Sequence, residues 1–498
     1  MYWANFLHFY QPPNQKREIV DAIAAQTYNP IFDGILTGTK GSLTVNITGS
    51  LLELLDRYDH HQLLEKMREA GRRGLVEYVG SAKYHAILPL LQPAEARRQI
   101  LINDEVNKRY LGDAYNRRGF FCPEMAYGPK LAPVLEELGF DWVLLDELAY
   151  NGKIGAVDYT KTYVIEGTNL KAFFREHRLS DTLMAASTHT VEETIEAIGP
   201  KELELNRYLL TGLDGETFGH HRVGHERLLL QLLAEPKLNM VTTSTLLDKF
   251  PDTETVATVA CTWASNKADL EEGVPYITWD DPTNEIHELQ WKLTNLVSSE
   301  IAKLPVEHPD YPRLRSAMDP ALSSDQFFWA AARPWWMIEH IERGAHMLVE
   351  VLSQLPTSSQ ESKSSGQNLY QQIMGMAWEW QRNGRLDAGH KNRNELLRIP
   401  FIDRTKTQGG EGVAVWDAFI HLFDEREQRA AARQNYEAAE LWRNAKYKLE
   451  HRLDIYDAFH VIDMLRAHLP SNMVEAELTR YRDQYNHIRG GQSEQRSH

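Results

Sequence analysis

The sequence predicts an α/β fold: an incomplete parallel (β/α)7 barrel followed by a helical C-terminal region. Up to residue 281, short apolar runs alternate with segments whose apolar residues recur at helical spacing, and strands that alternate with helices pair in parallel. From Pro282 onward the strand signals stop and long helical patterns follow. The chain of 498 residues is too long for one small core, although an α/β barrel takes up much of that length.

Seven short apolar runs, each bounded by turn-forming residues, are candidate strands of this barrel. In chain order they are ANFLHF (4–9), SLTVNIT (42–48), GLVEYVG (74–80), RGFFCPE (118–124), FDWVLLD (140–146), YLLTGLDG (208–215) and NMVTTST (239–245). Between the third and fourth runs, Ile102, Val106 and Tyr110 recur at i, i+4 and i+8, which predicts a helix that Gly112 ends. The run PVLEELGFDWVLLDE predicts a helix, then Gly139 just past its end, then a buried strand.

We place the barrel at residues 1–281, with an inserted hairpin near 158–176 in which TYVIEG and LKAFFRE flank Thr168 and Asn169. The segments expected after the barrel are a helical region packed on it at 282–355, a polar linker or mobile loop at 356–368, a C-terminal helical region at 369–487 and a disordered tail at 488–498. Within the C-terminal region, the stretch from about Val413 to Leu469 predicts a helical hairpin packed on the barrel.

Charge and composition restrict the partners. A formal net charge of −16 argues against nucleic acid or an anionic membrane, because those surfaces require clustered Lys and Arg, whereas a neutral sugar polymer fits. The N-terminus lacks a secretion signal and no run of about 18 apolar residues occurs, so we expect a cytoplasmic protein. Cys122 and Cys261 indicate neither a disulfide framework nor a zinc site, and no glycine-rich phosphate loop is present, so we expect no metal and no cofactor. The oligomeric state stays open.

Polar residues close several of the apolar runs, and in a parallel barrel the C-terminal ends of the strands meet at one mouth. These residues are His8, Tyr10, Gln11, Glu77, Tyr84, His85, Glu124, Asp214 and Glu216. Each alone has an ordinary explanation, since Asp-Gly is common in turns and a residue beside Pro-Pro can cap a loop. Two carboxylates that converge on one cleft, however, are what glycoside hydrolysis requires: one attacks the sugar and the other protonates the leaving oxygen.

Five stretches in this order resemble the five short regions of glycoside hydrolase family 57. They are HFYQPP (8–13), VEYVGSAKYHAILPL (76–90), FFCPEMAY around Glu124, LDGETFGHHR (213–222) and TWASNKADLEEGVPYITWDDP (262–282). The resemblance covers roughly the first 350 residues, and FFWAAARPWW (327–336) is similar to a helix of bacterial members. It implies a (β/α)7 barrel followed by helices, and activity on α-glucans.

The resemblance also implies roles for particular residues. Glu124 corresponds to the nucleophile and Asp214 to the general acid/base of a retaining enzyme. His8, Gln11, Glu77, His85 and Glu216 would line the subsite for the cleaved sugar. We add His220 and Trp279 as candidate sugar-binding residues; Trp279 stands beside Asp280 and Asp281, and a ring there is either core or a sugar platform. The adjacent His220 and His221 point to opposite faces of a strand, which disfavours a shared metal.

The first region departs from the family's His-x-His-Gln-Pro pattern, because Tyr10 replaces the second His, and the fifth region also differs. The predicted activity is α-amylase-like cleavage of α-1,4 bonds through a covalent glycosyl-enzyme. A 4-α-glucanotransferase or a glucan branching enzyme with the same site is the alternative. Outside this class, a metal-dependent carbohydrate deacetylase or zinc mannosidase, or a glucan-binding protein without catalysis, stays open.

Overall fold

The computed structural model describes residues 1–332, 335–386, 413–451, 473, 476–477 and 479–480. The chain divides into two compact units, residues 1–215 with 230–389 and residues 216–229 with 390–498. Among the described residues, no helix is long and apolar enough to cross a membrane.

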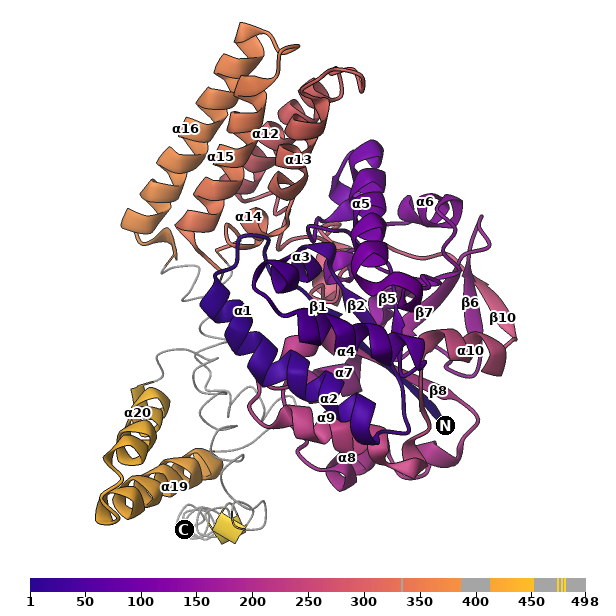
Figure 1. Cartoon of the computed structure of the whole chain (residues 1–498), viewed down its shortest axis with the longest axis vertical. Helices are drawn as coiled ribbons and strands as arrows, with labels where there is room; N and C mark the ends of the chain where they lie inside the picture. The colour runs from indigo at the N-terminus through magenta and orange to yellow at the C-terminus, as the bar shows by residue number, and fades with distance from the viewer. Residues whose placement is uncertain (333–334, 387–412, 452–472, 474–475, 478, 481–498) are drawn as a thin grey trace, which may run out of the picture. The chain divides into compact units, whose positions relative to one another are not determined.

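Two five-stranded sheets form the barrel of the first unit (Figure 1). The first has β1 (Tyr2–Phe9) between β2 (Leu43–Ile47) and β8 (Tyr208–Asp214), with β3 (Val76–Tyr78) beyond β2 and β9 (Met240–Val241) also on β1. The second has the order β10 (Thr253–Val256), β6 (Thr162–Ile165), β7 (Lys171–Arg175), β5 (Trp142–Asp146), β4 (Gly119–Phe121).

The two sheets join in two places. A parallel bridge between Gly80 and Phe120 connects the segment after β3 to β4, and the Glu176 amide, just past β7, donates to the Leu210 carbonyl of β8 at 2.7 Å. Strands β1, β2, β3, β4, β5, β7 and β8 therefore follow one another around a barrel that is incomplete because it has seven strands, one fewer than a (β/α)8 barrel. The predicted fold class is confirmed.

Two of the strand predictions need correction. NMVTTST contributes only the two residues of β9, because α10 (Thr243–Lys249) begins directly after it. The inserted hairpin near 158–176 is present, with β6 and β7 antiparallel, but its second strand is also a strand of the barrel. β7 pairs in parallel with β5, and Ala172, Phe173 and Phe174 are fully buried. β7, rather than residues 239–245, is therefore the seventh strand of the barrel.

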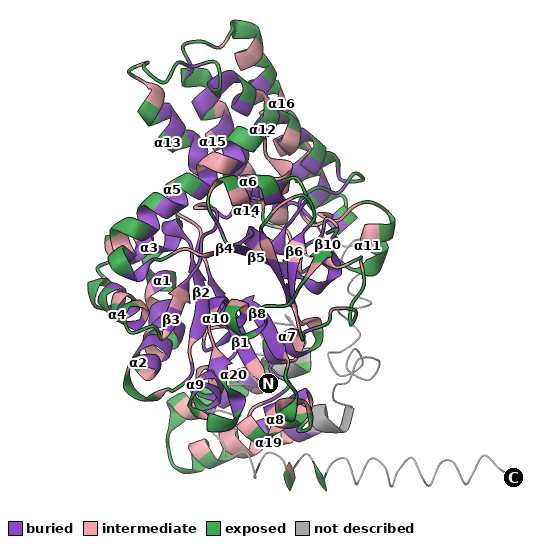
Figure 2. Ribbon diagram, turned by 90° about the vertical axis from the view of Figure 1, so that its right-hand side faces the viewer, coloured by how far each residue is buried: buried purple, intermediate pink, exposed green. Residues whose placement is uncertain are grey.

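Helices surround the strands, and Figure 2 shows buried strands at the centre and exposed residues on the outer faces of the helices. Up to residue 271, the helices with seven or more residues within the first unit are α1 (Arg17–Ile23), α2 (Asn29–Gly38), α3 (Gly49–Arg57), α4 (His61–Arg72), α5 (Pro93–Leu111), α6 (Leu131–Glu137), α7 (His177–Met184), α8 (Val191–Ile198) and α10. α9 (His225–Ala234) begins in the second unit and ends in the first, and α11 (Lys267–Glu271) is shorter. After α6, Gly139 has φ +80°, a conformation that glycine adopts without strain, and it leads the chain into β5 as predicted.

A helical region follows the barrel within the same unit (Figure 1). It consists of α12 (Glu285–Ile301), α13 (Tyr311–Ala321), α14 (Asp325–Phe328), α15 (Ile338–Gln354) and α16 (Gln360–Arg382). All of these helices except α14 share one apolar core. The helical region meets α5 of the barrel through two ion pairs. Arg315 binds Glu95 at 2.9 and 2.6 Å in a buried pair, and Arg98 binds Asp319 through Nε and Nη2, both at 2.7 Å, in a partly buried pair.

Residues 356–368 are not the polar linker that their composition predicts. Most of this segment is the first part of α16, which begins at Gln360. The Ser359 hydroxyl accepts a hydrogen bond from the Ser362 amide, which caps the helix, and Gly366 packs against Leu352 of α15. The Ser-rich pattern thus belongs to a helix whose polar face is solvated.

The second unit contains an antiparallel helical pair, α19 (Val413–Ala432) and α20 (Tyr436–His451), at the start of the predicted hairpin. Phe423 packs against Trp442 with ring centroids 5.9 Å apart, and Lys446 pairs with Asp424 at 2.6 Å. The expected packing of this hairpin on the barrel stays a prediction. The remainder of the hairpin at 452–469, residues 387–412 and the tail at 488–498 lie outside the described residues.

Candidate active site

His8 stands near the C-terminal end of β1, at the centre of a row of polar residues on neighbouring strands. In the parallel register it is paired with Asn46 of β2 on one side and Asp214 of β8 on the other. Residues paired in this way point to the same face of a sheet, so the three side chains lie side by side at one mouth of the barrel. His8 and Asn46 are buried, whereas Asp214 is partly exposed.

A chain of hydrogen bonds fixes the protons on His8 and His85. Burial lowers the pKa of His8 to about 4 and lowers that of His85 well below its usual value, so both rings are neutral near pH 7. His8 Nδ1 lies 2.8 Å from Asn46 Oδ1, an acceptor, so this nitrogen carries the proton. His8 Nε2 therefore accepts from His85 Nε2 at 3.0 Å, and His85 Nδ1 accepts from the Ser324 hydroxyl at 2.9 Å.

Tyr10 anchors the His85 ring to the helical region. The two rings are stacked, with centroids 4.1 Å apart and planes at 9°. The Tyr10 hydroxyl donates to Asp325 Oδ2 at 2.7 Å, and the Ser323 hydroxyl donates to the same oxygen at 2.8 Å. The residue that departs from the family pattern in the first region is thus bonded to α14, which lies more than 300 residues later in the sequence.

Glu124 lies just after β4 in a tight turn formed by residues 123–125. Its φ of +59° is in the left-handed region, which non-glycine residues occupy at a cost of about 1 kcal/mol or more. Trp263 holds this residue from two sides: its indole Nε1 donates to Glu124 Oε2 at 2.7 Å, and its backbone amide donates to the Glu124 carbonyl at 3.2 Å. The other carboxylate oxygen, Oε1, lies 3.9 Å from His85 Nε2, and the side chain is 20% exposed.

Glu124 and Asp214 interact electrostatically. The pKa of Glu124 is raised to about 8, chiefly by burial and next by the charge of Asp214, while the hydrogen bond from Trp263 opposes the shift. Burial also raises the pKa of Asp214 to about 6, against the positive charge of Arg175. Two such groups titrate as a pair, so between about pH 6 and 8 they share a single proton.

Arg175 is a buried cation below Asp214 at the end of β7. Its side chain is 3% exposed, and Nε donates to the Gly212 carbonyl of β8 at 2.7 Å. The two terminal nitrogens bind Asp146 at 3.2 Å and Asp181 at 2.6 Å. These contacts hold the guanidinium at the carbonyl of Gly212, two residues before Asp214 in β8. There its positive charge favours the ionised form of the Asp214 carboxylate.

The structure separates Glu77 from this cluster. Glu77 pairs in register with Thr44, which is level with Phe6 and thus nearer the N-terminal ends of the strands than His8. Its carboxylate accepts hydrogen bonds from the Ser244 amide at 3.0 Å and from Thr44 Oγ1 at 3.3 Å, so we leave Glu77 out of the proposed site. Gln11 is buried, and its side-chain oxygen accepts from Gln15 at 3.0 Å. Its place in the sugar subsite stays a prediction.

Trp279 is not a sugar platform. It is 1% exposed and packs with Ile87, Ala126 and Phe327, so the core interpretation of this ring is the correct one. The apolar cluster buries the ring faces that a sugar would need. Glu216 and His220 belong to the second unit, so their relation to Glu124 and Asp214 stays a prediction.

Several residues that complete the cluster are absent from the set predicted from the sequence: Asn46, Arg175, Trp263, Ser324 and Asp325. Trp263 lies in the fifth region, and its place in that region was a usable signal. Ser324 and Asp325 carry no local signal, because only the tertiary fold brings α14 to the mouth of the barrel. Among the described residues, no group of three or more His, Cys, Asp or Glu side chains could hold a metal ion.

Comparisons with known proteins agree with this architecture. The model of glycosyl hydrolase family 57 matches residues 10–259, about half of the chain. Alpha-amylase 1 of Dictyoglomus thermophilum is 24% identical over 149 residues, which are 30% of this chain and 21% of that protein. An alpha-amylase of Pyrococcus horikoshii is 22% identical over 256 residues, 49% of this chain and 40% of the relative. The chain thus aligns with only a fifth to two fifths of these relatives.

A solved structure shows the same fold. The 4-alpha-glucanotransferase from Thermococcus litoralis superimposes with a TM-score of 0.57 at 18% sequence identity, over 71% of this chain and 58% of that one. The superposition extends well beyond the residues of the family match and so includes part of the chain that follows the barrel.

Proposed function

Because the chain belongs to glycosyl hydrolase family 57, we propose that it cleaves α-1,4 glucosidic bonds of α-glucans with retention of anomeric configuration. Glu124 is the nucleophile and Asp214 the general acid/base. One observation carries the proposal: Glu124 follows β4 and Asp214 ends β8 at the same barrel mouth, and the charge of Asp214 contributes to the raised pKa of Glu124. A pair of interacting carboxyl groups is the machinery of retaining glycoside hydrolysis.

In the first step, Glu124 Oε1 attacks the anomeric carbon while Asp214 transfers its proton to the glycosidic oxygen. The bond to the leaving sugar breaks and an ester to Glu124 forms. Trp263 supports this step because its indole N–H holds the other carboxylate oxygen, Oε2, so that Oε1 points away from the indole ring. In the second step, Asp214 accepts a proton from water, whose oxygen attacks the anomeric carbon and releases Glu124.

The position of the shared proton matters for this mechanism. In the sugar-free site the higher pKa belongs to Glu124, which favours the proton there, whereas the reaction needs it on Asp214. Both arrangements carry the same total charge, so pH does not select between them. A bound glucan does, because its glycosidic oxygen accepts a hydrogen bond from protonated Asp214 and its anomeric carbon attracts an ionised Glu124.

A 4-α-glucanotransferase reaction is the second candidate, favoured by the structural match to such an enzyme. It uses the same glycosyl-enzyme, but an acceptor sugar rather than water takes the glucosyl group. A branching enzyme differs again in transferring the chain to a 6-hydroxyl. The same two carboxylates serve all three reactions, so the products distinguish them.

The test is product analysis with the purified chain and maltooligosaccharides of defined length. Hydrolysis yields only shorter products with new reducing ends, transfer yields longer chains as well, and branching yields α-1,6 linkages. Glu124→Gln should reduce turnover by a factor of about 100 or more, whereas Glu105→Gln, an exposed glutamate on α5, should retain it. Binding of glucans without any turnover would instead support a glucan-binding protein.

A further inference from the structure

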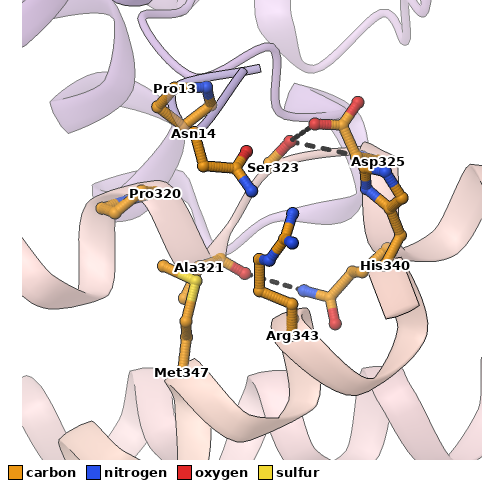
Figure 3. A pocket seen from close by; sticks show the side chains of 11 residues that line it. Pro13, Asn14, Pro320, Ala321, Ser323, Asp325, His340, Arg343 and Met347 are labelled. Atoms are coloured by element: carbon orange, nitrogen blue, oxygen red, sulfur yellow. Dashed lines mark hydrogen bonds between the residues drawn. The ribbon is translucent and has the colours of Figure 1, made fainter. Parts of the chain in front are cut away.

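A pocket of about 240 Å³ lies between the N-terminal loop after β1 and the helical region (Figure 3). Pro13 and Asn14 form its loop side, and residues of α13, α14 and α15 form the remainder. Figure 3 shows Asn14 and Arg343 pointing toward one another across it, with Asp325 and His340 on one side and Met347 on the other. Asn14 and Arg343 are exposed, so the pocket opens to solvent.

The polar side chains that line the pocket differ in whether their atoms have hydrogen-bond partners. With its amide oxygen turned toward Arg343, Asn14 accepts hydrogen bonds from Nε at 3.1 Å and from Nη1. Gln326 is 3% exposed; its amide nitrogen donates to the Ala321 carbonyl at 2.7 Å, whereas Oε1 has no partner. This oxygen is closed off from solvent, so the polar groups that a ligand in the pocket can reach are the exposed ones of Asn14 and Arg343.

Gly344 makes room for that amide. A Cβ at this position would lie 2.5 Å from Gln326 Oε1, a distance that real side chains do not show. Any other residue at 344 would displace the Gln326 side chain. The glycine of α15 therefore leaves room for Gln326 in the lining of the pocket.

The chemistry of the lining selects the class of ligand. One cation, Arg343, is balanced by one carboxylate, Asp325, so neither an anion nor a cation is favoured. Donors and acceptors both face the space, and Pro13, Pro320 and Met347 supply apolar surface. The volume is below the roughly 300–1,000 Å³ of pockets that hold drug-sized ligands. A single neutral ring with hydroxyl groups on its edge and apolar faces fits these properties.

Asp325 connects this pocket to the proposed active site. Its Oδ2 accepts from Tyr10, whose ring is stacked on His85, and its charge contributes to the raised pKa of Glu124. Resting on the proposed function, we propose that the pocket binds one pyranose residue of the α-glucan, separate from the residue that Glu124 attacks. Arg343 and Asn14 contact its hydroxyl groups.

Two variants test the pocket: Arg343→Ala removes its cation, and Met347→Trp fills it. Titration calorimetry with maltoheptaose on the Glu124→Gln background should show dissociation constants about tenfold higher for both, the loss expected from one or two hydrogen bonds. In the active enzyme, the ratio of kcat/KM for maltoheptaose to that for α-glucosyl fluoride, which needs only one sugar subsite, should fall by the same factor. Arg382→Ala, an exposed arginine on α16, is the matched control.

The outcomes separate the two proposals. If the unmodified chain turns over neither substrate, the proposed function is wrong, and calorimetry alone then decides whether the pocket binds a sugar. If the chain is active but Arg343→Ala and Met347→Trp behave like Arg382→Ala in both assays, the pocket proposal is wrong. Thermal unfolding of each variant shows whether a loss of affinity reflects misfolding, and the exposed Arg343 keeps the test valid if Met347→Trp unfolds.

Discussion

Glu124 combines three features that rarely occur together at one residue. It is in the left-handed backbone region, its carboxylate is bound by an indole N–H, and its pKa is raised to about 8. Strained backbone and shifted pKa values cluster at functional sites because such sites give up local stability for chemistry. His85, 3.9 Å away, also has a positive φ, 57°.

These pKa values predict a bell-shaped pH dependence of kcat/KM for maltooligosaccharides. The reactive form holds one proton on the Glu124 and Asp214 pair. Below about pH 6 both groups are protonated and no nucleophile remains; above about pH 8 neither is, and no acid remains. The rate should therefore be highest between these values.

α-Glucosyl fluoride provides the internal control for this profile, because fluoride leaves with little acid help. Its alkaline limb should be much weaker, while the acid limb stays. Identical alkaline limbs for the two substrates would show that the limb does not report the proton on Asp214.

A site residue could be predicted when its local sequence places it at the end of a strand. Glu124, Asp214, His8 and His85 follow apolar runs, so their strand-end positions were visible in the sequence. Ser324 was not, because its contact with His85 depends on a fold that brings residues 239 positions apart together. Trp279 shows the limit of composition: an aromatic residue beside two aspartates has the same sequence context whether it faces a sugar or the core.

At the scale of elements, the contact between α5 and α13 fixes the helical region on the barrel. Arg315 is 5% exposed and binds Glu95 through both terminal nitrogens, and it also binds Asp319 at 3.1 Å. α14, which supplies Ser324 and Asp325 to the site, follows α13 directly. The geometry of the site therefore depends on this buried junction.

Arg315→Met should lower the free energy of unfolding by about 3 kcal/mol or more, because removal of one partner leaves the buried Glu95 without compensation. Urea unfolding measures the loss. Arg98→Met, whose side chain is 31% exposed, should cost clearly less. A stability for Arg315→Met within about 0.5 kcal/mol of the unmodified chain would mean that the junction does not stabilise the fold.

Element types were predictable where periodicity was strong and less so where composition misled. The helix at 93–111 and the helix, glycine and strand around Gly139 agree with the pattern. The Ser-rich start of α16 has the composition of a linker, but capping by Ser359 and packing against α15 stabilise a helix there. The pattern predicts β7 only as half of an inserted hairpin, because its pairing with β5 is a long-range contact.

At the scale of the whole molecule, the barrel brings together side chains that are distant in sequence. β1, β4 and β8 carry His8, Glu124 and Asp214 to one mouth, and the helical region adds Asp325. The fold class was predictable because alternation of strands and helices constrains topology. The roles of the two carboxylates, by contrast, are a matter of chemistry that stereochemistry can test.

A double-displacement enzyme forms its ester on the face opposite the leaving group and breaks it from the first face. Azide should therefore rescue the two carboxylate deletions with opposite outcomes on α-glucosyl fluoride. In Glu124→Ala, azide occupies the vacated space and attacks from the β face, which gives the β-azide. In Asp214→Ala the ester still forms, and azide attacks it from the α face without a general base, which gives the α-azide.

The anomeric configuration of the azide product, determined by NMR for each variant, is therefore the decisive measurement. We expect β from Glu124→Ala and α from Asp214→Ala, with starch turnover reduced in both by a factor of about 100 or more. The same anomer from both variants, or near-normal starch activity in Glu124→Ala, would contradict the assignment of Glu124 as nucleophile and Asp214 as acid/base.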